Sequence, residues 1–183
     1  MTRKTLAALA AVATVATSAA TAHADRLTAL VRDGDSACFT RQFTGAAREA
    51  GQRLRSLTLA VTRADRLRPD DPAVAEIRVT FQRTDRPGTF VYRAICADEI
   101  PGGAGCLGNL PPSSPQEASE ASVVIRPGAR QALLSLASSL AVVPRNAADP
   151  EVVVLPFGAA DGRLTLTRAP LAACGLSDPS ARL

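Results

Sequence analysis

An alternating stretch from Ala75 to Cys96 constrains the fold more than any other part of the sequence. Apolar residues at positions 75, 77, 79 and 81 alternate with polar residues at 76, 78, 80 and 82, which is the pattern of a strand with one buried face. Pro87 and Gly88 then favour a tight turn, because proline presets φ and glycine accepts positive φ. Alternation resumes from Thr89 to Cys96. We therefore predict a β-hairpin whose second strand ends at a cysteine.

Strand signals recur along the chain, whereas helix signals are few. Alternation predicts strands at 56–62, 121–126 and 163–168, and an uninterrupted apolar run predicts an inner strand at 152–157. Asp161 and Gly162 favour a hairpin between the strands at 152–157 and 163–168. The run 131–143 fits a strand or a helix face, and its strand-rich surroundings favour a strand. One or two helical turns are predicted between residues 44 and 51.

The first 24 residues have the organisation of a secretory signal peptide. Arg3 and Lys4 precede an apolar run from Leu6, and small residues lead to Ala24, so we predict cleavage before Asp25. The apolar run is too short to span a bilayer, and no later stretch is long enough. We therefore expect residues 25–183 to form one soluble β-rich domain in the periplasm or outside the cell.

The composition excludes several classes of function. Losing Arg3 and Lys4 lowers the net charge from +4 to +2, whereas a general nucleic-acid binder is strongly basic. His23 is the only histidine and leaves with the signal, and the mature chain has no lysine. Histidine-based triads and dyads, histidine-ligated zinc and lysine Schiff bases therefore cannot be built. We predict no enzyme activity, no metal and no cofactor.

The catalytic groups that this composition still allows are a carboxylate pair, Tyr92 and an activated serine of a rarer kind. Two carboxylates can supply the acid and the base of glycoside hydrolysis. No spacing argument favours such a pair among the candidates, which are Asp65, Asp70, Asp71, Asp98 and Glu99.

The four cysteines of the mature chain point to two disulfides, since an even number in an exported protein is typical of a disulfide framework. Of three possible pairings, position favours Cys96 with Cys106, which closes a short loop, and Cys38 with Cys174, which ties the two ends of the domain. Chain entropy would make these bridges worth about 3 and nearly 5 kcal/mol. A four-thiolate zinc site is the alternative, but its paired short spacings are missing.

Arginines gather between residues 41 and 68 and give this segment a local charge of +5. They form the candidate anion-binding surface, which could meet phosphate or carboxylate groups of an envelope polymer. The alternative is that they solvate the outer face of a strand and a helix. The set comprises Arg41, Arg48, Arg53, Arg55, Arg63, Arg66 and Arg68.

A segment rich in glycine, proline and serine follows Cys96 and is predicted to be a long loop. Its glycines at 103, 105 and 108 match the G-x-G-x-x-G expression of dinucleotide-binding turns. That motif requires a helix to begin there, whereas Pro111 and Pro112 would stop one within a turn. We therefore exclude nucleotide binding and consider 100–115 the segment most suited to contact a partner.

The framework of the mature chain resembles a group of small exported bacterial proteins of unknown function. The resemblance is carried by CFTRQF from Cys38, GQRLRSLTLAV from Gly51, the strand ending at Cys96, the glycine-rich segment with Cys106, and the tail RLTLTRAPLAAC. Members often carry further cysteines around the middle loop, where this chain has only Cys106. The resemblance implies a periplasmic all-β fold and no assigned activity.

The sequence thus predicts an all-β fold, a small antiparallel sandwich or barrel braced by two disulfides, with one short helix near the N-terminus. Export, a rigid scaffold and no catalytic constellation favour a non-catalytic binding or inhibitory module that meets a periplasmic protein. The alternative is an envelope-associated protein that binds anionic glycan or lipid through the arginine cluster.

Overall fold

The fold is that of a computed structural model, which describes residues 27–31, 36–45, 50–64, 73–100, 103–108, 120–145 and 151–177. The predicted signal peptide lies outside these ranges, and so do residues 46–49 of the helix predicted at 44–51. A helix of four residues, α1 Leu27–Leu30, precedes the first strand and lies outside the range predicted to be helical. Apart from further short helical turns, the described chain is an antiparallel sheet with two disulfides, so the predicted all-β class is confirmed.

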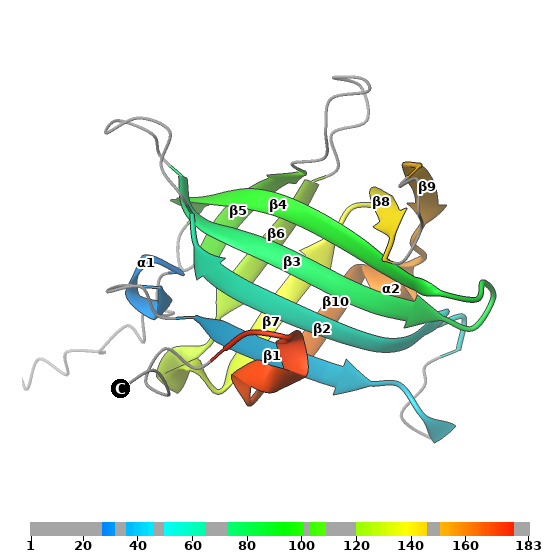
Figure 1. Cartoon of the computed structure of the whole chain (residues 1–183), viewed down its shortest axis with the longest axis horizontal. Coiled ribbons are helices and arrows are strands. Elements are labelled where there is room, and N and C mark those ends of the chain that lie inside the picture. Colours follow the sequence, from blue (N-terminus) through cyan, green and yellow to red (C-terminus); the bar gives the residue numbers. More distant parts are fainter. Residues whose placement is uncertain are drawn as a thin grey trace, which may run out of the picture.

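Eight antiparallel strands close into a barrel, in the order β3-β2-β1-β10-β7-β6-β5-β4, with β4 pairing back onto β3. In Figure 1, β1 to β4 form one wall, and β5, β6, β7 and β10 form the other. The strands are β1 Ala37–Gln42, β2 Leu54–Arg63, β3 Ala73–Arg83, β4 Thr89–Ile100, β5 Gly103–Gly108, β6 Glu120–Ile125, β7 Gln131–Leu136 and β10 Arg163–Ala169.

Two further strands extend the sheet beyond the barrel. β8, Ser139–Pro144, pairs with β4 at Phe90 and Val91, and β9, Val153–Pro156, pairs with β8. β4 therefore has β3 on one edge, and on its other edge β8 near the start and β5 near the end. The run 131–143, which the sequence left open between strand and helix, is strand, as its surroundings favoured. It forms two strands, β7 and β8, with residues 137 and 138 between them.

The barrel interior is filled by the inward-facing half of each alternating strand. Ile77, Val79 and Phe81 of β3 are fully or almost fully buried, and Tyr92 and Phe90 of β4 lie opposite the last two. Burying one such side chain contributes about 1.5–3 kcal/mol. Burial also raises the pKa of the Tyr92 hydroxyl well above its ordinary value. The predicted hairpin is confirmed, and Gly88 of its turn has the expected positive φ of 105°.

The two disulfides lie on opposite faces of the barrel wall. Cys96 and Cys106 are direct partners in the β4–β5 ladder and belong to the interior core. Cys38 of β1 is joined to Cys174, in the 3-10 turn η5 Leu171–Cys174, and this pair packs with Ala60 in a separate outer cluster. The favoured pairing is confirmed. The inner bridge reinforces barrel closure, and the outer one fixes η5 against β1 and β2.

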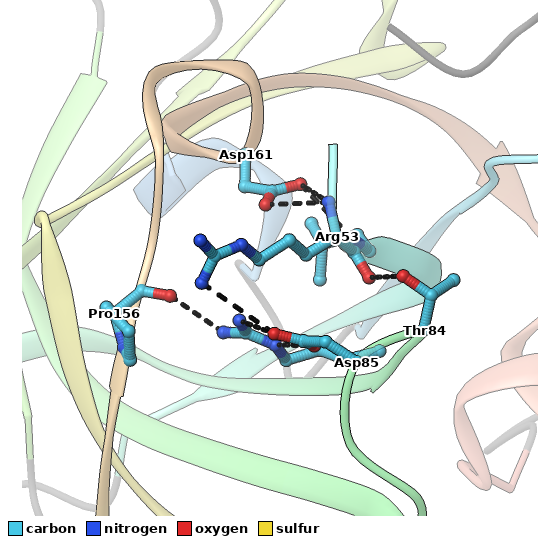
Figure 2. A network of polar contacts seen from close by, with 7 residues as sticks. Arg53, Thr84, Asp85, Pro156 and Asp161 are labelled. Carbon is cyan, nitrogen blue, oxygen red and sulfur yellow. Dashed lines mark hydrogen bonds and ion pairs between the residues drawn. The ribbon is translucent and has the colours of Figure 1, made fainter. Parts of the chain in front are cut away.

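A polar clamp closes one end of the barrel (Figure 2). Asp161, in the helical turn α2 Ala159–Gly162, is 1% exposed, and its carboxylate accepts the backbone N–H groups of Arg53 and Leu54 at 3.0–3.2 Å. Arg83 donates to the carbonyl of Pro156 at 2.7 Å and to both carboxylate oxygens of Asp85. The clamp thus joins α2 to the start of β2, and β9 to the β3–β4 turn.

The chain between β9 and β10 departs from the predicted hairpin. β9 pairs with β8, and β10 pairs with β1 and β7, so the strands expected to pair with each other are separated. The physical reason is the clamp, since Asp161 binds the backbone of β2 and α2 leads the chain across the barrel end. β9 is also not the inner strand expected, because Val154 is 53% exposed on the outer strand of the sheet.

The glycine-rich segment after Cys96 contains a strand that the sequence pattern does not reveal. β5 forms part of the barrel wall between β4 and β6, so the prediction of one long loop is wrong for residues 103–108. Small residues carry little strand propensity. Pairing with Cys96 and barrel closure determine the conformation instead. The glycines of the G-x-G-x-x-G expression lie in this strand and not at the start of a helix.

Replacing Asp161 with alanine should destabilise the protein by about 2–3 kcal/mol. The partly buried N–H group of Arg53 and the buried N–H group of Leu54 would lose a charged acceptor, and a buried donor left without a partner is costly. Urea unfolding measures the change in free energy. The matched control is Glu151→Ala, an exposed site outside the clamp, which should change stability by less than about 0.5 kcal/mol. Equal values for both variants would contradict the clamp's role.

The Arg83–Asp85 ion pair should make the free energy of unfolding depend on pH in the acidic range. The hydrogen bonds from Arg83 lower the pKa of the Asp85 carboxyl below its ordinary value of 3.8. A carboxyl whose pKa is lower in the folded protein stabilises the fold at any pH above its pKa in the unfolded chain. That stabilisation is lost as the pH falls through the pKa of the carboxyl in the folded protein. The difference in unfolding free energy between the native protein and Asp85→Asn should therefore shrink below about pH 3.8. Unfolding curves between pH 7 and 2 test this, and a constant difference would refute it.

Candidate functional site: an arginine-lined groove

A groove of about 460 Å³ lies on the outer face of the barrel, over β2, β3, β4 and β8. One wall is formed by η5, the red turn that lies against β1 and β2 in Figure 1. Residues Ala172 to Gly175 border the groove there. The groove is therefore built from strands that are far apart in sequence and from the C-terminal turn that the outer disulfide holds.

The floor of the groove is a row of short side chains on adjacent strands. Thr58 of β2 lies opposite Thr80 of β3, Thr80 lies opposite Val91 of β4, and Val91 lies opposite Val143 of β8. Thr58, Thr80 and Val91 face outward because their sequence neighbours on each side are buried in the core, and Val143 of β8 follows the buried Val142. Two hydroxyl groups and two apolar side chains thus form a shallow, mixed surface.

Three arginines line this floor. Arg78 of β3 and Arg93 of β4 are direct partners in the antiparallel ladder. Arg145 follows β8, and its backbone N–H donates to the carbonyl of Thr89 at 2.8 Å. Like charges directly opposite one another are unfavourable in a sheet. An anion bound between Arg78 and Arg93 would relieve that repulsion.

The disulfide-held turn η5 orients one of these arginines. Arg78 donates from a terminal guanidinium nitrogen to the carbonyl oxygen of Cys174 at 2.6 Å. Cys174 is held in turn by its bridge to Cys38. Arg78 is partly buried, whereas Arg93 and Arg145 are exposed. The groove therefore combines one fixed guanidinium with two that are free to meet a ligand from solvent.

The described lining of the groove contains no carboxylate. Within the part of the chain that the structure describes, the ion pairs involve Arg53 and Arg83, both with Asp85 at the clamp. Guanidinium groups bind carboxylate and phosphate by paired N–H donors. The arrangement is suited to hold an anionic group, and its lining residues supply neither a nucleophile with an adjacent base nor a carboxylate pair.

The structure distributes the arginines of the sequence-predicted cluster over several places. Arg48, Arg66 and Arg68 lie outside the described residues. Arg53 belongs to the clamp, and Arg63 lies at the far end of β2, roughly 26 Å along the strand from Arg55.

Arg41 is the remaining member of that cluster. Its guanidinium donates to the carbonyl of Thr165 at 3.3 Å and lies 4.9 Å from the ring centroid of Phe43. The described members of the cluster therefore do not share one surface, and anion binding by this set as a whole stays a prediction.

Sequence reasoning missed Arg78, Arg93 and Arg145 as a group, because Arg145 lies 52 positions after Arg93 and no local pattern joins them. A partial signal was available. Arg78 and Arg93 both occupy outward positions of the predicted hairpin. The predicted turn, with Pro87 and Gly88 at its centre, would not pair them, because the observed pairing is centred between Asp85 and Arg86. The position of Arg145 depends on the β4–β8 pairing, which the sequence does not indicate.

Other features of the described chain bear on where the protein works. The two disulfides indicate an oxidising compartment. No described helix has the length and apolar character required to cross a membrane. Among the residues with assigned positions, no group of three or more histidine, cysteine, aspartate or glutamate side chains could hold a metal ion.

Comparisons of this chain with protein-family models, with curated proteins and with solved structures find no match.

Proposed function

We propose that the protein is an exported, non-catalytic binding module that holds an anionic group of its ligand in the groove between Arg78, Arg93 and Arg145. The observation that supports this most directly is the cross-strand pair Arg78–Arg93, two like charges held opposite each other without a carboxylate in the described lining. An unrelieved pair of this kind costs stability. A bound anion turns the same pair into a recognition element.

The scaffold around the groove supports a binding role. Barrel strands position Thr58, Thr80 and Arg93, and the outer disulfide fixes η5 as a wall. A site built on strands and a covalently held turn loses little conformational freedom when a ligand binds, which favours affinity. The disulfides and the predicted signal peptide are consistent with a protein that is located in the periplasm or outside the cell.

The contact surface proposed here differs from the loop that the sequence favoured. Residues 103–108 of that segment form β5 in the barrel wall, so deleting 100–115 would remove a strand and disrupt the fold. A loss of binding in such a deletion would not identify a contact. Single substitutions at exposed arginines are the sharper test.

Arg93→Ala and Arg145→Ala should each weaken binding of pyrophosphate, used as a small anionic probe, by about tenfold. The reason is that a charge-assisted hydrogen bond contributes about 1.5–3 kcal/mol, part of which solvent offsets at an exposed site. Isothermal titration calorimetry on the oxidised protein at low salt measures the affinity. Binding by the native protein should also weaken as salt is added, because salt screens exposed charges.

Arg126→Ala is the matched control. Arg126 is exposed, follows β6 and does not line the groove, so its loss changes net charge by the same amount. Affinity equal to that of the native protein is expected for this control. If all three variants weaken binding alike, the effect is one of net charge, and the groove is not the site. If the native protein does not bind the probe, the proposal fails.

A further inference from the structure

We infer that the groove is one end of a longer track that binds a carboxylated glycan chain. This inference rests on the proposed function and names the class of its ligand. It is carried by two neighbouring hollows that share residues with the groove, by the arginines placed along them, and by the apolar side chains between those arginines.

The three hollows follow one another around the tip of the β3–β4 hairpin. A second hollow of about 500 Å³ is bordered by Pro144 and Arg145, which also border the groove. A third hollow of about 530 Å³ is bordered by Arg86 and Pro87, which also border the second. The shared residues make the hollows adjacent, so an extended ligand can pass from one to the next.

Positive charge recurs along this track. After Arg78 and Arg93 come Arg145, then Arg86, then Arg55, and the last three are exposed. Arg145 lies beside Thr89, because its backbone N–H donates to the Thr89 carbonyl. Thr89 and Arg93 are four residues apart on β4, which is roughly 13 Å along the strand. The cations are thus spaced along a path and are not gathered at one point. Such spacing fits a chain with repeated anionic groups better than a single small anion.

One carboxylate lies on the described part of the track, and arginine already neutralises it. Asp85 borders the third hollow, where it accepts two hydrogen bonds from Arg83 at 2.7–2.8 Å. Arg53 lies 3.7 Å from the same carboxylate. Arg55 and Arg86 remain outside this pairing among the described contacts. The third hollow is therefore still net positive.

Apolar side chains separate the arginines. Pro87, Phe90, Pro144 and Val153 border the second hollow, and the side chain of Phe90 is almost fully buried against Phe81. A sugar ring presents C–H groups on its faces, which can lie over proline and valine, and carboxylates at its edge, which can reach arginine. A polyphosphate has no apolar face to use this surface. The alternation of cation and apolar patch therefore favours an acidic glycan.

The track is held in shape before any ligand binds. The clamp fixes both the β3–β4 turn and the end of β9, through Arg83 and the Pro156 carbonyl. The hydrogen bond from the Arg145 N–H to the Thr89 carbonyl fixes the end of β8 against β4. Pre-organisation lowers the conformational cost of binding a flexible chain. Once one anionic group of the glycan chain is bound, the next group along the chain is held close to its own arginine. Its effective concentration there is high, so contacts at several points together raise the affinity of the whole chain.

The test uses oligogalacturonates of increasing length, from the monomer to the octamer, with the oxidised native protein. Affinity should rise with length until the track is spanned and then level off. The double variant Arg55→Ala/Arg86→Ala should bind the longest oligomer about tenfold more weakly, since two exposed charge contacts are lost. Its affinity for the monomer should equal that of the native protein, because the groove is unchanged. Arg126→Ala/Arg130→Ala, two exposed arginines off the track, is the charge-matched control.

Each outcome decides a separate point. A length-dependent gain that the double variant loses and the control keeps supports the track. No gain with length, or a gain that the double variant keeps, overturns the track while leaving the groove proposal standing. An equal gain with oligophosphates of matched charge overturns the assignment to a glycan. Loss of monomer binding in the double variant, with an unchanged urea unfolding midpoint, would overturn the division into groove and track.

Discussion

The pairing of β4 on both of its edges is the constraint on which the rest of this structure depends. Along one edge β4 follows β3 for almost its whole length, and this hairpin forms locally from alternation and a tight turn. The other edge is divided, with β8 near the start and β5 near the end. The β5 pairing closes the barrel, and the β8 pairing brings Arg145 beside the hairpin. One strand thus determines both the core and the outer surface.

The outer surface shows what a rigid barrel permits. Arg78 and Arg93 are held opposite each other although their charges repel, because each lies on a strand whose inward neighbours are deeply buried. The free energy of that burial far exceeds the repulsion of two partly solvated guanidinium groups. A less constrained segment would move them apart. The fold therefore stabilises an arrangement that is unfavourable by itself and useful for an anionic ligand.

Local patterns in the sequence predicted the fold class well, and long-range pairing limited the rest. The β3–β4 hairpin, β2, β6 and both disulfides follow from alternation, turn residues and cysteine positions. β5 was missed because Gly103, Ala104 and Gly105 have no strand pattern of their own. The β9–β10 hairpin was wrongly predicted because Asp161 has a partner in β2, more than 100 residues earlier. For the same reason, the groove arginines could not be grouped without the β4–β8 register.

The outer strand β9 has a consequence for how copies of this protein behave in solution. Eight strands close into the barrel and β8 pairs with β4, which leaves β9 as the outer strand of the sheet, with Val154 exposed. Such an edge can template pairing between chains. Here the edge is four residues long and ends in Pro156, which has no N–H to donate. The carbonyl of Pro156 is already taken by Arg83. The clamp that closes the barrel end therefore also removes a point of self-association, which protects the protein from edge-to-edge aggregation.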